Sequence, residues 1–411
     1  MSRIYDAIVV GARCAGSPTA MLLARKGYHV LLVDRATFPS DTISTHIVHP
    51  QAVAALARWG LLGRLAATGC PPVDTYAFDF GPFTIAGSPG TPDSPVTYCP
   101  RRTILDKLLV DAAAEAGVEV RENFAFDAVL TENDRVVGIR GHSGDGISAE
   151  ERARIVIGAD GRRSSVADAV RPVQYNQRPP ILAPYYAYWS GLPMHGRFEN
   201  YIRPYRGFAA VATHDDLTMI VGGWPCTEFA SNKNDIEGNF LRTVIGIVPE
   251  FAERMRSAKR ETRYSGTPVP NFFRKPYGPG WALVGDAGYT RDPITAQGIL
   301  DAFSSAEACT QALDEFFRGE RQFNDAMANY QRSRDERVLP MFEFTCQLAT
   351  LEPPSPQSQQ LFAAIHGNPA AMNDFARMNA GGLSPAEFLS PSNVERLLSE
   401  ARARPSGSAI R

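Results

Sequence analysis

The sequence predicts an α/β + β fold: a domain built on a parallel sheet, an inserted antiparallel sheet and a C-terminal helical region. Three observations lead to this fold class. An apolar strand, a glycine-bearing turn and an alanine-rich helix open the chain. A second apolar strand ends in the GADG turn at 158–161, and a third precedes Gly285 and Asp286. Buried strands that alternate with helices are typical of parallel sheets.

The opening segment has the residue types that a dinucleotide site requires. Residues 7–10 form an apolar strand, and Gly11 and Gly16 bracket the turn into the helix. Glycine allows a tight turn and close helix–strand packing, so that the helix N-terminus faces a pyrophosphate. The next apolar run along the chain, residues 29–33, ends in Asp34, at the spacing where an acid accepts hydrogen bonds from a ribose. The segment therefore predicts a dinucleotide cofactor.

Arg13 stands where the usual motif has its middle glycine, at the closest approach to the phosphates. Two interpretations stay open: the side chain turns outward, or its guanidinium supplements the backbone donors on the diphosphate. A surface arginine on an ordinary βα turn is the simpler alternative. We disfavour it because strand, helix, second strand and terminal acid are all in place.

Three later segments extend this site and specify a flavin. Arg102 opens an amphipathic helix, where it suits a phosphate or a ribityl oxygen, or else caps the helix. Asp160 follows the apolar strand at 155–157. Asp286 follows the one at 281–284, where its carboxylate can accept a hydrogen bond from a ribityl hydroxyl. Gly298 and Ile299 begin a helix whose N–H groups suit the negative charge of a reduced flavin. We therefore expect FAD.

The segments GARCAG with Asp34, GADGRRSSV and GDAGYTRDPITAQGI resemble those of single-component (class A) FAD-dependent monooxygenases of the p-hydroxybenzoate hydroxylase type. They are also similar to those of geranylgeranyl reductases and flavin-dependent halogenases, over roughly residues 5–315. The resemblance implies a Rossmann-like FAD-binding domain, with NAD(P)H as reductant and no separate nicotinamide domain. The residues implied to bind FAD are Gly11, Arg13, Cys14, Ala15, Gly16, Asp34, Arg35, Arg102, Asp160, Asp286, Gly298 and Ile299.

Interruptions of the cofactor pattern divide the chain into predicted regions. Residues 71–96 are rich in proline and glycine and predict a hairpin that joins the substrate domain. Residues 176–275 alternate like strands and predict an inserted antiparallel substrate-binding sheet. The FAD-binding domain then has three parts, at 1–70, 97–175 and 276–320, and residues 321–411 form a C-terminal helical region.

Composition favours a soluble cytoplasmic enzyme, which we expect to be a monomer or homodimer and to act on a small molecule. The chain has 411 residues, 44% of them hydrophobic, and a net charge of −2. This near-neutral charge does not indicate the basic surface that binds nucleic acid. No apolar run reaches the ~18 residues of a membrane span, and the first strand leaves no room for a signal peptide. The six cysteines are scattered, which argues against disulfides and a metal site.

The resemblance implies two reactions. In the hydroxylases NAD(P)H reduces FAD, O2 adds to it, and a flavin hydroperoxide hydroxylates the substrate, here an aromatic or polycyclic small molecule. The alternative is alkene reduction of the geranylgeranyl-reductase type. Asp292-Pro293 replaces the double proline of the hydroxylases and leans toward the reductases, but Ser44-Thr45-His46 replaces the Cys-Gly pair of the reductases. The W-x-W-x-I-P motif of the halogenases is missing.

Candidate substrate residues come from the predicted inserted sheet. Tyr186 and Tyr188 share one strand face, as pocket wall or as sheet core. Tyr201 matches the hydroxylase tyrosine that binds the substrate phenol, whereas the carboxylate-binding serine and arginine fall on Ala212 and His214, which puts a benzoate in doubt. His214 either binds substrate or is a partly exposed loop histidine. The predicted pocket comprises Tyr186, Tyr188, Tyr201, His214, Trp224 and Pro293. Tyr201 and His46 are the catalytic candidates, although His46 is equally well a packing or surface residue.

Overall fold

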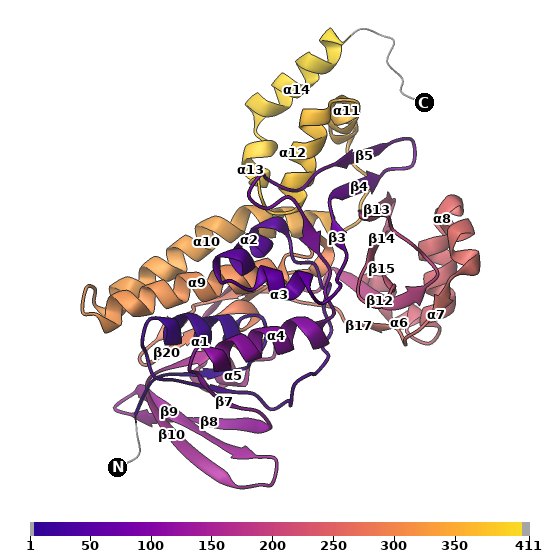
Figure 1. The fold of residues 1–411 in the computed structure, drawn as a ribbon. Helices are drawn as coiled ribbons and strands as arrows, with labels where there is room; N and C mark the ends of the chain where they lie inside the picture. Colours follow the sequence, from indigo (N-terminus) through magenta and orange to yellow (C-terminus); the bar gives the residue numbers. More distant parts are fainter. Residues whose placement is uncertain (1–3, 405–411) are drawn as a thin grey trace.

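The computed structural model describes residues 4–404, in which two large sheets are joined by helices (Figure 1). The first sheet is parallel at its centre, where β1 pairs with β2 and β10, and β10 pairs with β20. The predicted mixed α/β fold with several sheets is confirmed. In spatial order the main strands of the first sheet are β19 (Tyr277–Gly278), β20 (Trp281–Leu283), β10 (Ser148–Gly158), β1 (Tyr5–Val10), β2 (Val30–Val33) and β7 (Glu119–Arg121).

Both faces of this sheet are covered at its centre, which is why residues 7–10, 30–33 and 155–157 of its strands are all apolar. Ala7 and Val9 pack on one side against α1 (Gly16–Arg25), α4 (Arg102–Glu115) and α9 (Gly298–Phe317). Ile8 and Val10 pack on the other side, where α5 (Ser165–Val170) and the antiparallel strands β8 (Phe124–Glu132) and β9 (Arg135–Ser143) lie.

The turn from β1 into α1 depends on two glycines. Gly11 has a φ of +103°, and a Cβ there would lie 2.6 Å from the carbonyl oxygen of Ala159. A Cβ on Gly16 would lie 1.7 Å from the carbonyl oxygen of Gly11. Only glycine fits where two backbones approach so closely. The start of α1 is therefore fixed against the end of β10.

The second sheet is largely antiparallel. The hairpin of β4 and β5, which lies between residues 71 and 96, joins this sheet because β4 pairs in parallel with β13. β17 (Ser265–Gly266) pairs with β12 at the opposite side. In spatial order the other strands are β16 (Lys259–Arg260), β12 (Leu182–Ser190), β15 (Thr218–Pro225), β14 (Arg206–Ala212), β13 (Arg197–Arg203), β4 (Thr75–Asp79) and β5 (Thr84–Gly87).

The two faces of the second sheet have different partners. Tyr186, Phe198 and Met219 pack toward the C-terminal helices. Residues next to them in sequence, such as Tyr185 and Ile220, pack against the short helices between 229 and 257. Strand alternation assigns every side chain to one face or the other. This assignment decides which side chains reach the functional site.

The C-terminal region is helical, as Figure 1 shows. Helix α10 (Phe323–Leu348) packs beside α9, above the strands of the first sheet in the view of Figure 1, and α12 (Pro369–Asn379) packs on β5 of the β4–β5 hairpin. No helix within residues 4–404 combines the length and the apolar composition needed to cross a bilayer. The remaining helices are α11 (Pro356–Ile365), α13 (Pro385–Phe388) and α14 (Pro391–Ala403).

Candidate cofactor and substrate site

A cavity of about 1320 Å³ is lined by residues from both sheets, from α9 and from the C-terminal helices. Sites for one drug-sized ligand have volumes of ~300–1,000 Å³. The cavity therefore has room for a cofactor together with a substrate. Most of its charged residues gather around the ends of β1, β10 and β20. Its other end, beside α11 and α12, has mostly apolar side chains, with Glu352, Ser355 and Asn379 among them.

The three cofactor motifs come together at the polar end. A Cβ on Gly285, whose φ is +56°, would lie 2.7 Å from the Cβ of Ala15. Gly11 makes an equally close approach to Ala159, next to Asp160. Turns from the front, the middle and the back of the chain therefore touch one another. Eleven of the residues predicted to bind FAD line the cavity: Gly11, Arg13, Cys14, Ala15, Asp34, Arg35, Arg102, Asp160, Asp286, Gly298 and Ile299. Gly16 lies just below them in α1.

The carboxylate of Asp34 can accept further hydrogen bonds, such as those that a ribose would donate. Its Oδ2 accepts a hydrogen bond from the amide of Ala12 at 2.7 Å, and its Oδ1 accepts from the amide of Ala36 at 2.8 Å. Each carboxylate oxygen has a second lone pair. The two amides therefore fix the orientation of the carboxylate and leave acceptor sites for hydroxyls in the cavity.

Arg13 is directed to a buried acid that the sequence analysis did not identify. Its Nη1 donates to Asp106 at 2.6 Å and to the carbonyl oxygen of Ser40 at 3.2 Å. Arg102 also donates to both carboxylate oxygens of Asp106. Asp106 thus holds both arginines at the cavity wall. The spacing of Arg102 and Asp106, four residues apart in a helix, was the available sequence signal.

Asp286 presents its carboxylate to the cavity. The side chain is open to solvent through the cavity, although protein atoms surround it on the other sides. This burial raises its pKa to about 6; the charge of Asp301 raises the pKa further, whereas Arg102 and Arg162 act in the opposite direction. A carboxylate that is costly to ionise here gains most from ligand hydroxyls that donate to it.

The start of α9 opens directly on the cavity. A Cβ on Gly298 would meet no atom within 4 Å, and Gly298 is exposed. Ala296, just before it, adopts a left-handed conformation with φ of 54°. The first amides of a helix lack partners within the helix and carry its positive end. Together with Asp34 and Asp286, this open glycine fits a flavin dinucleotide, whose contacts with these residues stay a prediction.

Two predicted substrate residues, Tyr201 and Trp224, belong to the core cluster on the sheet face opposite Tyr186. Tyr201 contributes to the wall, but its hydroxyl donates to Glu199 at 2.9 Å and its ring stacks on Phe208 on the opposite sheet face. Trp224 is fully buried beside Tyr185 on that same face. Tyr201 therefore lines the cavity as predicted, with its hydroxyl bonded to Glu199, whereas Trp224 does not line the cavity and its predicted place in the pocket is wrong.

Three further candidates are packing residues. The hydroxyl of Tyr188 lies 2.7 Å from Nε2 of His46, and neither residue lines the cavity. His46 is fully buried, and burial lowers its pKa to about 3. His214 is 2% exposed and bonds Thr68 at 2.8 Å, so it is neither a pocket residue nor a partly exposed loop histidine. The packing interpretation applies to all three. Of the predicted pocket residues, Tyr186, Tyr201 and Pro293 line the cavity.

His49 and Tyr76 lie between the two ends of the cavity and were not predicted. The hydroxyl of Tyr76 lies 2.8 Å from Nδ1 of His49, and Nε2 of His49 lies 3.2 Å from the carbonyl oxygen of Thr295. Nε2 of His49 also lies 3.3 Å from the amide nitrogen of Gln297, so the donor in each of these contacts depends on the tautomer of the ring. Burial lowers the pKa of His49 to about 4, so the ring is neutral.

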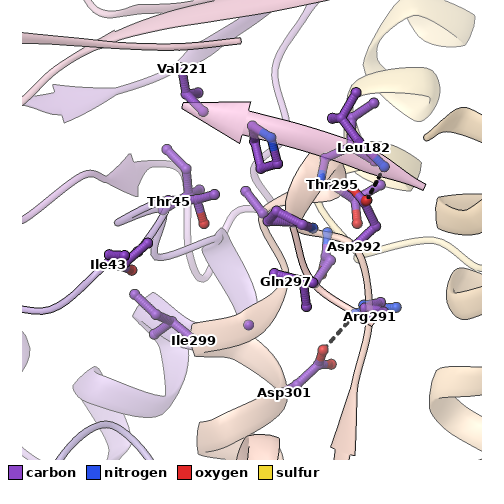
Figure 2. Close-up of a pocket in the computed structure, with 18 of the residues that line it drawn as sticks. Ile43, Thr45, Leu182, Val221, Arg291, Asp292, Thr295, Gln297, Ile299 and Asp301 are labelled. Atoms are coloured by element: carbon purple, nitrogen blue, oxygen red, sulfur yellow. Dashed lines mark hydrogen bonds and ion pairs between the residues drawn. The ribbon is translucent and has the colours of Figure 1, made fainter. Parts of the chain in front are cut away.

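The loop before α9 also carries a buried acid. Asp292 accepts hydrogen bonds from the amides of Leu182 at 3.2 Å and Ile294 at 3.1 Å. It is 1% exposed, and burial raises its pKa to about 7. Figure 2 shows Asp292 bonded to Leu182 and, below it, the ion pair of Arg291 and Asp301. Among residues 4–404 no group of three or more potential metal ligands occurs.

Residues 4–345 match the FAD binding domain family. Digeranylgeranylglycerophospholipid reductase 2 of Methanopyrus kandleri is 31% identical over 343 residues, which are 76% of this chain and 78% of that protein. The 6-methylpretetramide 4-monooxygenase of Streptomyces rimosus is 26% identical over 366 residues, 81% of each chain.

Solved structures share the fold. A flavoprotein/dehydrogenase from Cytophaga hutchinsonii has a TM-score of 0.82 at 19% identity, covering 97% of this chain and 99% of that one. The myxobacterial chondrochloren halogenase has a TM-score of 0.79 at 22% identity, covering 97% of both. Since the family match spans most of the chain and includes every cofactor motif, the protein belongs to the FAD binding domain family of class A flavoproteins and is an FAD-dependent oxidoreductase.

Proposed function

We propose that the protein is an FAD-dependent reductase that saturates a carbon–carbon double bond in an elongated apolar substrate. One observation carries this proposal: the cavity continues from the start of α9 along an apolar wall into the C-terminal helices. That wall suits a ligand held by apolar contact over its length rather than by a charged anchor. It is lined by Phe78, Phe80, Leu351, Leu361, Phe375 and Met378.

The site residues supply orientation, charge and a proton. When bound, the flavin supplies the electron pair, and NAD(P)H is part of the proposal as its source. The positive end of α9 would stabilise negative charge at Gly298 and Ile299. Saturation of a double bond also takes up two protons. Asp292 lines the cavity, and with a pKa of about 7 it can hold and release one of them near neutral pH.

The observations at the substrate end also weigh against phenol hydroxylation. The hydroxyl of Tyr201, which matches the phenol-binding tyrosine of the hydroxylases, is already bonded to Glu199, a residue that does not line the cavity. His214 does not line the cavity either. The M. kandleri relative, which is a reductase by name, supports the same choice.

An anaerobic assay tests the proposal. The FAD-loaded enzyme is reduced with NAD(P)H in the absence of oxygen and given polyunsaturated apolar lipids. We expect reoxidation of the flavin by the lipid and a product heavier by two hydrogen atoms, measured by mass spectrometry. Reduced flavin that persists with every lipid and reoxidises only when oxygen is admitted would refute the reductase.

A monooxygenase is the second candidate. Such an enzyme would use NAD(P)H and O2 to hydroxylate an aromatic or polycyclic small molecule. Tyr186 lines the cavity as an aromatic wall, and the S. rimosus relative is a monooxygenase by name. Its signature is substrate-stimulated oxygen uptake with a product heavier by one oxygen atom.

A further inference from the structure

Two facing walls of the substrate end have matching spacings. Along β4 and the residue after it, Tyr76, Phe78 and Phe80 line the cavity alternately, at roughly 7 Å per step. On α12, Phe375 and Asn379 line it four residues apart, which is about 6 Å along a helix. The side chains of the two elements therefore meet in successive levels along the cavity.

The innermost level is bonded to the loop that leads into α9. Tyr76 reaches the carbonyl oxygen of Thr295 through His49. On the opposite wall, the carbonyl oxygen of Asn379 accepts a hydrogen bond from Nε2 of Gln297, which belongs to the same loop, at 2.9 Å. This level closes around the residues just before Gly298 and forms the inner chamber of the cavity.

The next two levels are pairs of aromatic rings. Phe78 and Phe375 meet edge to face, with ring centroids 5.1 Å apart and planes at 81°. Farther out, Phe80 and Phe362 stack with centroids 4.7 Å apart. Phe388 packs behind Phe375 at 6.1 Å and does not line the cavity. The rings are thus held from behind and project toward one another from opposite walls.

We propose that Phe78 and Phe375 form an aromatic gate between the inner chamber and the outer channel. The gate selects a linear apolar chain and rejects fused-ring molecules. Both rings are buried, at 7% and 5% exposure, and they are in van der Waals contact, so a ligand passes between them only if one ring moves out of its packed position. A flexible chain is narrower than a fused ring system and needs the smaller movement, and it spans three levels, roughly 14 Å. The inference rests on the proposed function only in assuming an apolar substrate.

Binding measured without turnover tests the gate. The FAD-loaded enzyme is titrated with octanol, dodecanol, hexadecanol and planar pyrenemethanol, and the change in flavin absorbance reports binding. The wild type is expected to bind hexadecanol at least tenfold more tightly than pyrenemethanol. Phe375→Ala should gain at least tenfold for pyrenemethanol. Phe375→Trp should lose at least tenfold for hexadecanol, and less than threefold for octanol.

Phe388→Leu is the matched control, because it alters the same aromatic cluster behind the gate and should leave the selectivity unchanged. If Phe375→Ala does not retain flavin, Phe78→Leu carries the same test from the other wall. Equal wild-type affinity for pyrenemethanol and hexadecanol would overturn the gate, as would an equal change in Phe388→Leu. Chain-length selectivity without any alkene reduction would refute the proposed reaction and leave the gate intact.

Discussion

The two ends of the cavity are built in different ways. At the cofactor end the backbone itself forms the wall, because Gly11, Gly285 and Gly298 bring the chain close to itself or to the cavity. At the substrate end the wall consists of side chains such as Phe78 and Phe375, which come from elements far apart in the sequence. The cofactor end is therefore intolerant of small changes in backbone volume. The substrate end is open to change by exchange of side chains.

The largest effect is expected at the cofactor end, from Gly16→Ala. The added Cβ would lie 1.7 Å from the carbonyl oxygen of Gly11, so α1 has to move away from β1. We expect a protein without bound flavin and with a lower melting temperature, measured by absorbance and calorimetry. Gly63→Ala, where a Cβ meets nothing within 4 Å, is the control and should keep its flavin. Normal flavin content in Gly16→Ala would mean that the backbone there yields easily.

At the substrate end Asp292→Asn tests whether this acid supplies a proton. General acids contribute ~10²–10⁴-fold to rates, so reduction of substrate should slow by about a hundredfold or more. Because the pKa of Asp292 is raised to about 7, the wild-type rate should fall as the pH rises through 7 and the carboxyl loses its proton. The variant should lack this fall. An unchanged pH profile in the variant would assign the proton to another group.

Asp286→Asn should separate cofactor binding from stability. Loss of a charged acceptor is expected to weaken FAD binding roughly 10–100-fold, measured by titration of the FAD-free protein. Asp286 has a pKa raised to about 6 in the fold, so the unfolded chain releases its proton at lower pH. The FAD-free wild type should therefore lose stability as the pH rises from about 4 to 6, and the variant should not. Parallel losses of FAD affinity and stability would contradict this separation.

The smallest effect is expected from Tyr201→Phe. The lost hydrogen bond to Glu199 should lower the free energy of unfolding by about 1–2 kcal/mol, measured by denaturant titration. Turnover should change less than threefold, because the hydroxyl is already bonded to Glu199, which does not line the cavity. A loss of a hundredfold or more in turnover would restore the phenol-binding role and favour the hydroxylase.

The same contrast explains what the sequence could predict. The turns at Gly11 and Gly285 are local features with a fixed spacing, so the positions around the polar end of the cavity followed from the chain alone. Strand alternation correctly assigned Tyr186 and Tyr188 to one face, since both belong to the same cluster. The predicted contact of the Tyr201 hydroxyl with a substrate was harder to anticipate, because a one-residue difference in a strand exchanges the two faces. Tyr201 packs in the cluster on one face and Ile202 against the cluster on the other, although both contribute to the cavity wall.

Other features depend on contacts that no local pattern encodes. His214 looks like a loop residue, yet tertiary packing leaves it 2% exposed. The hydrogen bond between His49 and Tyr76 joins the start of α2 (Pro50–Arg58) to β4, two elements that no local pattern brings together. Phe78 and Phe375 become neighbours only after the C-terminal helices fold over the hairpin. Long-range packing of this kind has no signature in spacing or composition.

Gln297 connects the two halves of the enzyme. It immediately precedes the open glycine at the start of α9, and its amide group is tied to the last residue of α12. A shift of α12 by an occupant of the apolar channel would thus be transmitted through one side chain to the amides beside the cofactor. The hydrogen bond of Gln297 therefore gives the substrate channel and the cofactor end a shared structural element.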